Sequence, residues 1–231
     1  FATTVPDAAY RSCINAKLGL DADADPTPEQ LATITELSCT RKGIADATGT
    51  SAIPNLTKLF LDENQLTDIS PIAGSTKLFS LGLGGNKISN IAPLASLTKL
   101  RAVKLNANQI RDFSVLSALP EYAAGSSQLS GQTITVDATL NVPALVPTVI
   151  GDKAEIVPVY TRPSDVPAGS TVTYPAVGDY PWVFKNESLY LNATITVHVI
   201  DSGVTIPDAK LRTCVNSRVG IDAAVQPTIS Q

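Results

Sequence analysis

Apolar residues recur along the first half of this chain at a fixed interval of 22 positions. A polar column keeps the same interval, because Asn64, Asn86 and Asn108 are spaced 22 residues apart. The apolar columns around it are Ile34, Leu56, Leu78, Leu100 and Tyr122; Leu37, Leu59, Leu81 and Val103; and Cys39, Leu61, Leu83 and Leu105. A short unit repeated at a constant interval predicts a solenoid, in which each coil buries its apolar face against the next.

Each unit has the form Leu-x-x-Leu-x-Leu-x-x-Asn-x-Leu/Ile, which is the pattern of a leucine-rich repeat. We expect a short strand at the Leu-x-Leu centre, a tight turn, and a brief return segment such as Leu66 to Ile72. The asparagine column is interpreted as scaffold, with buried amides that satisfy backbone groups of neighbouring coils. The predicted fold class over residues 34–130 is therefore an α/β leucine-rich-repeat solenoid, whose register decays after Leu119.

Residues 1–33 do not follow the repeat and are predicted to form a helical cap. Asp7 suits a first helical turn and Gly19 suits the left-handed C-terminal position, which predicts a helix over residues 5–19. The segment 27–30 (Thr-Pro-Glu-Gln) has the form of a capping box with proline at the first helical position. A solenoid needs such a cap because its terminal coil otherwise exposes an apolar end.

Two cysteines fall where the predicted cap meets the first repeat. Cys13 lies in the predicted helix and Cys39 lies in a leucine column of the adjoining strand, so both thiols should face one small core. We therefore predict a Cys13–Cys39 disulfide. Such a bond indicates an oxidising, extracytoplasmic location.

From residue 131 the hydrophobic period changes from 22 to 2. Alternating runs are Thr133 to Val136, Glu155 to Val157, Thr171 to Tyr174, and Leu189 to Ile200. Short alternating runs separated by Pro, Gly and Asp predict an all-β immunoglobulin-like sandwich over residues 131–203, with Trp182 as its core aromatic residue. We expect the first strand of this sandwich to continue the sheet of the solenoid.

Residues 204–231 are predicted to begin a second helical cap. With an offset of 201, residues 206–231 match residues 5–30 at 12 of 26 positions, and Cys214 matches Cys13. The chain is therefore interpreted as a slice of a longer protein built from tandem modules. Cys214 is expected to be unpaired in this segment, because the counterpart of Cys39 would fall near position 240.

The repeat motif is carried well by Leu56 to Ile72 and by Leu78 to Leu94, whereas the third full repeat has Phe113 and Val115 in place of Ile and Pro. A cap, 22-residue repeats of this form and a fused sandwich resemble the internalin family of Gram-positive bacterial surface proteins. The resemblance implies an extracellular or cell-surface location. It also implies that the concave face of the solenoid binds host proteins or other ligands, with the sandwich as a rigid support.

Side chains that alternate with the core leucines should point to the concave face. They are Glu36, Ser38, Thr40, Lys58, Phe60, Asp62, Ser80, Gly82, Gly84, Ala102, Lys104 and Asn106. From this set we select the candidate ligand-binding residues Glu36, Lys58, Phe60, Asp62, Lys104 and Asn106. Phe60 is the exception in a polar row: it fits an interface anchor, and the alternative is a surface aromatic residue with no contact.

Charge and composition exclude several classes of function. The net charge is −4 and the 17 Lys and Arg residues are scattered, which argues against nucleic-acid binding. No apolar stretch reaches the length of about 18 residues that a membrane span requires, so we expect no membrane insertion in this segment.

Catalytic and metal chemistry are not expected. His198 is the only histidine, and its alternation with Ile195, Val197 and Val199 places it on a wet sheet face. Acidic residues alternate over 21–25, but Pro26 and Ala32 occupy positions where a calcium loop needs Gly and Glu. The glycosylation sequons at Asn55, Asn186 and Asn192 are treated as incidental, and no cofactor is predicted.

The sequence therefore predicts a non-enzymatic cell-surface module for adhesion and protein binding. A protein ligand is favoured over a glycan, and neighbouring modules of the same protein are expected partners. The alternative is a structural unit of a tandem-repeat surface stalk or array that has no dedicated ligand.

Overall fold

The computed structural model describes residues 5–120, 122, 128–139, 144–145, 159–161, 171–172, 177–186 and 191–200. Some sequence predictions fall on other residues. The second cap over residues 204–231, Cys214, the strand over 155–157, and the side chains of Trp182, Asn186 and Asn192 lie outside the described part of the chain.

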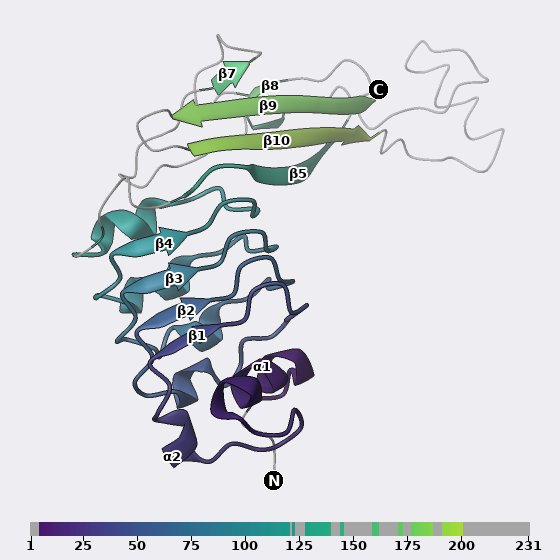
Figure 1. Cartoon of the computed structure of the whole chain (residues 1–231). Helices are drawn as coiled ribbons and strands as arrows, with labels where there is room; N and C mark the ends of the chain where they lie inside the picture. Colours follow the sequence, from purple (N-terminus) through teal and green to yellow (C-terminus); the bar gives the residue numbers. More distant parts are fainter. Residues whose placement is uncertain are drawn as a thin grey trace, which may run out of the picture. The chain divides into compact units, whose positions relative to one another are not determined.

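The 22-residue interval places four short strands side by side (Figure 1). They are β1 (Glu36–Ser38), β2 (Lys58–Phe60), β3 (Ser80–Gly82) and β4 (Ala102–Lys104). The strands are parallel and follow chain order, and each step pairs residues that are 22 positions apart, as in Glu36 with Lys58. The leucine-rich-repeat solenoid predicted from the columns is confirmed.

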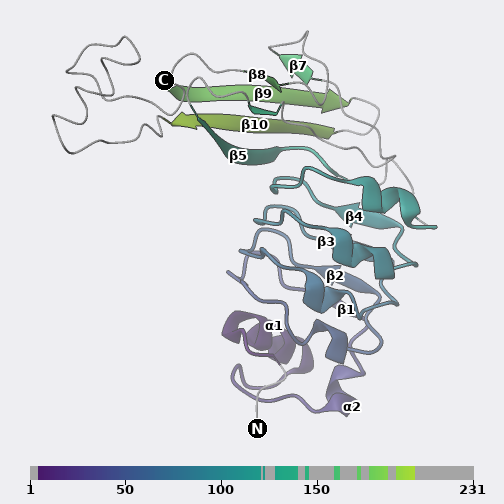
Figure 2. The ribbon, with the colours of Figure 1, turned by 180° about the vertical axis from the view of Figure 1, so that it is seen from behind.

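Each coil returns through a short 3-10 helix that lies behind the strands (Figure 2). These helices are Thr50–Ala52, Ser70–Ile72, Ala92–Ser96 and Ser114–Ala118. In three of them a side chain accepts a hydrogen bond from the backbone N–H two residues later, at 2.8–2.9 Å. The acceptors are Asp68, Asn90 and Asp112, which explains why a short polar residue precedes each of these turns.

The apolar columns fill the space between the strands and the return segments. Leu59, Leu81 and Val103 are at most 1% exposed, and Phe113 is fully buried where earlier repeats place an isoleucine. Burial of one such side chain stabilises the fold by roughly 1.5 to 3 kcal/mol. Tyr122, predicted to hold the last column, is only half-buried.

The asparagine column forms a ladder inside the turns. Asn64 Nδ2 donates to the carbonyl oxygens of Cys39 and Leu61 at 2.9 Å, and its Oδ1 accepts from the N–H groups of Lys42 and Ile44 at 3.0 Å. Asn86 and Asn108 repeat this pattern one and two coils later. The amides are therefore scaffold, as predicted, because they satisfy buried backbone groups that the turn leaves unpaired.

Gln132 closes the ladder, which the sequence columns did not anticipate. Its Nε2 donates to the carbonyl oxygens of Leu105 and Leu129, and its Oε1 accepts from Ile110 N. The last coil is two residues longer than the others, and Gln132 takes the place that asparagine holds in the earlier turns. A parallel bridge between Lys104 and Gln128 extends the sheet beside β4.

A second column marks the left-handed position of each turn. Arg41, Glu63, Gly85 and Ala107 all have φ between 53° and 68°, and Gly131 takes this conformation in the last coil. Left-handed backbone is strained for residues with a Cβ atom. The repeat therefore imposes the turn even where its sequence lacks glycine.

Helix α1 (Ala8–Leu18) begins at Asp7 and ends at Gly19, as predicted. One carboxylate oxygen of Asp7 accepts from Tyr10 N, and the other accepts from the N–H groups of Ala45 and Asp46 in the first repeat. Burial opposes ionisation of Asp7, but these backbone hydrogen bonds together lower its pKa below the ordinary value. The same carboxylate thus caps the helix and holds it to the solenoid.

The capping box at Thr27 and Gln30 is present and starts the short helix α2 (Pro28–Leu31). Tyr10 is fully buried and its hydroxyl lies 2.8 Å from Thr50 Oγ1, so burial raises the pKa of this phenol. These contacts pack the amino-terminal segment against the first coils.

The described residues after Gly131 contain strands in two sheets. The strands are β5 (Gln132–Thr139), β6 (Ala144–Leu145), β7 (Val159–Thr161), β8 (Thr171–Val172), β9 (Gly178–Asn186) and β10 (Leu191–Ile200). One sheet has the order β5-β10-β9-β7 and the other pairs β6 with β8. The expectation that the first strand continues the solenoid sheet is wrong, because β5 pairs with β10 rather than β4.

Candidate functional site

The side of β1–β4 that faces away from the leucine core, here called the sheet face, carries the candidate residues. The parallel register aligns two rows across the strands: Glu36, Lys58, Ser80 and Ala102; and Ser38, Phe60, Gly82 and Lys104. A third row of Thr40, Asp62, Gly84 and Asn106 follows the strand ends. All six predicted ligand-binding residues therefore lie on one surface.

Phe60 leans across the strand beside it. A Cβ atom at Gly82 would lie 2.9 Å from Phe60 Cδ1 and would overlap Asp62 Oδ2. Glycine is required here because both side chains occupy the space that a side chain of β3 would take. Phe60 is consequently half-buried, rather than exposed as the sequence suggested, but it lies outside the solenoid core.

Gly84 has the same relation to its neighbours. Its N–H donates to Asp62 Oδ1 at 3.1 Å, and a Cβ atom on it would lie only 2.5 Å from Asn106 Oδ1. The backbone at Gly82 and Gly84 therefore carries no side chain of its own. The carboxylate of Asp62 and the amide of Asn106 cover it from the two neighbouring coils.

A hollow of about 550 Å³ lies in the sheet face beside Gly84 and Gly85. Its lining includes Phe60, Asp62, Lys104 and Asn106, with the hydroxyl residues Ser38 and Thr40 at one side and Gln128 at the other. Four of the six predicted residues thus border one hollow, whereas Glu36 and Lys58 do not line it.

Glu36 and Lys58 form an exposed ion pair with 3.1 Å between Lys58 Nζ and Glu36 Oε2. The same ammonium group lies 5.9 Å from the ring centroid of Phe79. Phe79 is 39% exposed, making it one of the few large apolar side chains exposed among the described residues. Phe79 was not among the candidate residues because it precedes β3. Its position could have been noticed, since the other members of its 22-residue column are polar: Thr35, Thr57 and Arg101.

Glu63, which also lines the hollow, is paired with Arg41 on the neighbouring coil. Arg41 Nε and Nη2 donate to the two carboxylate oxygens at 2.5 and 2.6 Å. These hydrogen bonds lower the pKa of Glu63 and raise the pKa of Arg41. The charge of Glu63 is therefore already neutralised, unlike that of Asp62.

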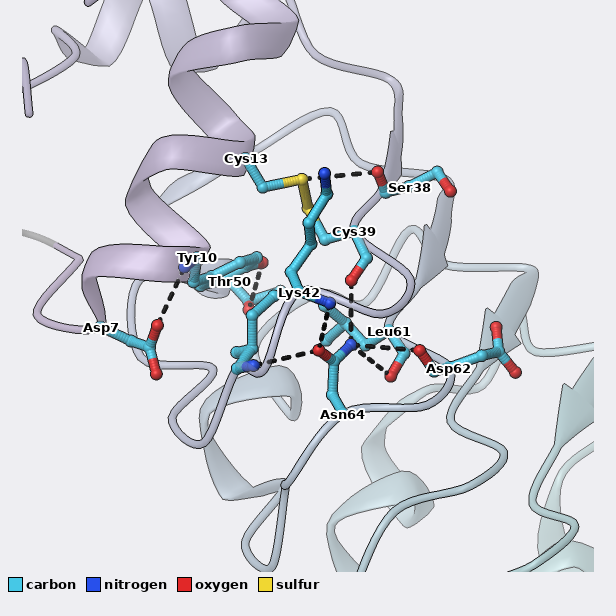
Figure 3. Close-up of a disulfide and its surroundings, with 11 residues drawn as sticks. Asp7, Tyr10, Cys13, Ser38, Cys39, Lys42, Thr50, Leu61, Asp62 and Asn64 are labelled. Carbon is cyan, nitrogen blue, oxygen red and sulfur yellow. Dashed lines mark hydrogen bonds between the residues drawn. A yellow bond between two sulfur atoms is a disulfide. The ribbon is translucent and has the colours of Figure 1, made fainter. Parts of the chain in front are cut away.

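The predicted disulfide is confirmed: the sulfur atoms of Cys13 and Cys39 are bonded and tie α1 to the residue after β1 (Figure 3). Figure 3 also shows Asn64 bonded to the backbone of this region, so the covalent link and the first rung of the ladder meet there.

The histidine and the acidic loop that could suggest catalysis or metal binding make structural contacts instead. His198 Nδ1 lies 2.6 Å from Asp179 Oδ1 on an exposed surface, while Ile195, Val197 and Val199 are buried as the alternation predicted. In the loop once considered for calcium, Asn15 Nδ2 donates to the backbone oxygens of Asp21, Ala22 and Ala24. Across the described ranges, no group of three or more acidic, His or Cys residues could hold a metal ion.

The sequon at Asn55 is engaged in the coil, since Asn55 Nδ2 donates to Ala32 O at 2.8 Å. Within the part of the chain that the structure describes, no helix has both the length and the apolar character needed to cross a bilayer.

Comparison with known proteins supports the repeat assignment. The family described as leucine rich repeat matches residues 53–117. No curated protein gives a significant match to this sequence.

Two solved structures from Listeria monocytogenes are similar. The internalin InlF is 36% identical with a TM-score of 0.51, over 55% of this chain and 39% of that chain. The internalin InlC2 is 27% identical with a TM-score of 0.50, over 55% of this chain and 58% of that chain. The chain thus spans less than two thirds of either protein.

Proposed function

Because this chain is an internalin-like leucine-rich-repeat protein, we propose that it is a non-enzymatic module that binds a protein at a bacterial cell surface through its sheet face. The observation that carries the proposal is the hollow beside Gly84, bordered by the half-buried ring of Phe60. Concave surfaces with a central aromatic residue and convergent polar groups are typical of binding sites.

The disulfide supports an extracellular or cell-surface location. A Cys13–Cys39 bond persists outside the cytosol, where thiols are not kept reduced. The internalin-like repeats support the same location.

The domain layout is part of this proposal. Residues 1–33 act as the cap, 34–130 as the binding solenoid and 131–203 as an immunoglobulin-like support. Residues 204–231 begin the next module of a tandem array. Neighbouring modules are then partners of this one.

Phe60→Ala tests the binding role. If the ring is an anchor, the substitution weakens binding of a surface-protein ligand by roughly 1 to 3 kcal/mol, which is about 5- to 150-fold. The melting temperature should change little, because the ring lies outside the leucine core. Binding is measured by capture of labelled surface proteins from candidate cells, followed by titration of the captured protein.

A matched control removes an apolar side chain elsewhere. Ile200 is 42% exposed on β10, and Ile200→Ala should leave binding unchanged. A confirmed ligand whose affinity ignores Phe60→Ala and Phe79→Ala alike would remove the sheet face as the binding surface.

The second candidate function is a structural unit of a surface stalk. It is favoured by the match of residues 206–231 to residues 5–30 and by the small number of aromatic residues on the sheet face. Tandem modules that bind no surface protein but add length to the intact protein in small-angle scattering would support it.

A further inference from the structure

Asp62 holds a carboxylate whose charge is not neutralised within the hollow. Its Oδ1 accepts from Gly84 N at 3.1 Å, while Oδ2 extends over Gly82. No basic side chain of the described residues forms an ion pair with it. The backbone N–H thus fixes the carboxylate and leaves its second oxygen available to a ligand.

The ring of Phe60 borders the same point. A Cβ atom on Gly82 would clash with both Phe60 Cδ1 and Asp62 Oδ2, so the ring and the carboxylate pack side by side over Gly82. A planar cation fits this pair of groups, because a guanidinium donates to a carboxylate while it stacks on an aromatic ring.

The basic side chains in or beside the hollow do not supply that cation. Lys104 lies on β4, two strands away from the coil that carries Asp62, and Arg41 is committed to Glu63. A neutral ligand such as a sugar can donate hydroxyl hydrogen bonds to Asp62 but leaves the carboxylate charge uncompensated when water is displaced. A cationic group compensates that charge, and the chain's net charge of −4 favours its approach.

We propose that the hollow beside Gly84 recognises an arginine side chain of the protein ligand, which pairs with Asp62 and packs against Phe60. This inference rests on the proposed function and specifies its chemistry. Lys104 and Asn106, on the opposite side, are placed to bond acceptor groups of the same ligand segment.

The test is a nuclear magnetic resonance titration of the full chain with two capped tripeptides, acetyl-Gly-Arg-Gly-amide and its citrulline counterpart. Citrulline has the shape of arginine without the charge. The arginine peptide should shift the Gly84 amide and the Phe60 ring signals, and should bind at least about 10-fold more tightly than the citrulline peptide. The difference should shrink as salt is raised.

Asp62→Asn should lower the affinity for the arginine peptide by at least about 10-fold, because the amide can still accept from Gly84 N but carries no charge. Asp23→Asn, which removes an exposed carboxylate outside the hollow, is the matched control and should leave the affinity unchanged. Thermal melting establishes that both variants fold, and the wild-type comparison of the two peptides does not depend on any variant.

Equal binding of the two peptides, the absence of a shift at Gly84, or a saccharide that shifts these signals instead would overturn the proposal. A protein ligand whose affinity falls with Phe60→Ala but not with Asp62→Asn would refute the arginine site and leave the proposed function supported. A protein ligand whose affinity changes with neither variant would count against the proposed function as well.

Discussion

The interior of the solenoid and its sheet face follow opposite rules, although both are built by the same strands. Inside, each coil repeats its neighbour: Leu59, Leu81 and Val103 occupy one column and Asn64, Asn86 and Asn108 another. On the sheet face no row repeats, and Phe60 stands between Ser38 and Gly82. The interior is uniform because every coil must bury its backbone and apolar atoms in the same way, whereas the sheet face carries no such requirement.

The largest expected effect comes from breaking the interior column. Asn86→Ala leaves the buried Leu66 N without a partner and takes one of two amide donors from Leu61 O and Leu83 O, which keep Asn64 and Asn108. The unsatisfied N–H costs about 1 to 3 kcal/mol and each lost hydrogen bond to a carbonyl about 0.5 to 1.5 kcal/mol, so we expect a loss of about 4 kcal/mol in the free energy of unfolding. Urea denaturation measures it.

Asn106→Ala is the control from the sheet face. This side chain covers Gly84 but is not part of the ladder, so its removal should change stability by less than about 0.5 kcal/mol. Equal losses in the two variants would contradict the division between interior and sheet face.

The next effect comes from the disulfide. Replacing Cys13 and Cys39 with alanine removes a link with a sequence separation of 26, worth roughly 3 to 4 kcal/mol in the chain-entropy model. Calorimetry of the double variant checks this, and the wild-type protein with reductant should melt at a similarly lowered temperature. Binding at the sheet face should persist at a temperature where the variant is folded. An unchanged melting temperature would mean that the link does not constrain the unfolded chain.

A smaller effect, this time a gain in stability, is expected at the left-handed turn positions. Ala107 holds a left-handed φ of 53°, so Ala107→Gly should stabilise the protein by about 0.5 to 1 kcal/mol, net of the added freedom of the unfolded chain. The reverse change, Gly85→Ala, introduces the strain and brings a Cβ atom to 3.1 Å from Glu63 Cγ. It should destabilise, and a stabilising Gly85→Ala would show that the turn is not strained.

The smallest effect belongs to the exposed pair of His198 and Asp179. The hydrogen bond to the carboxylate of Asp179 raises the pKa of His198 above its ordinary value. A raised pKa in the folded state means that any stabilisation is present below the ordinary pKa and is lost as pH rises through the raised one. Asp179→Asn should lower the pKa of His198, as measured by the chemical shift of its ring protons with pH. An unchanged pKa would place the two groups apart in solution.

Much of the fold could be predicted because the interior is periodic. The columns located the four strands, Asp7 and Gly19 located the first helix, and the positions of Cys13 and Cys39 gave the disulfide. The last coil was not predicted, since its two extra residues shift the register and Gln132 replaces asparagine. A column count cannot detect a substitution that conserves hydrogen bonds but changes both spacing and residue type.

For the candidate site, the sequence determined which side chains point away from the core, because alternation along a strand is a local property of the backbone. It selected Phe60, Asp62, Lys104 and Asn106 on that basis. Only the tertiary structure decided that they border one hollow, that Asp62 is fixed by Gly84 N, and that Phe79 reaches Lys58. These contacts join residues from different coils, and their geometry depends on where glycines of β3 and its turn leave space, which no single repeat specifies.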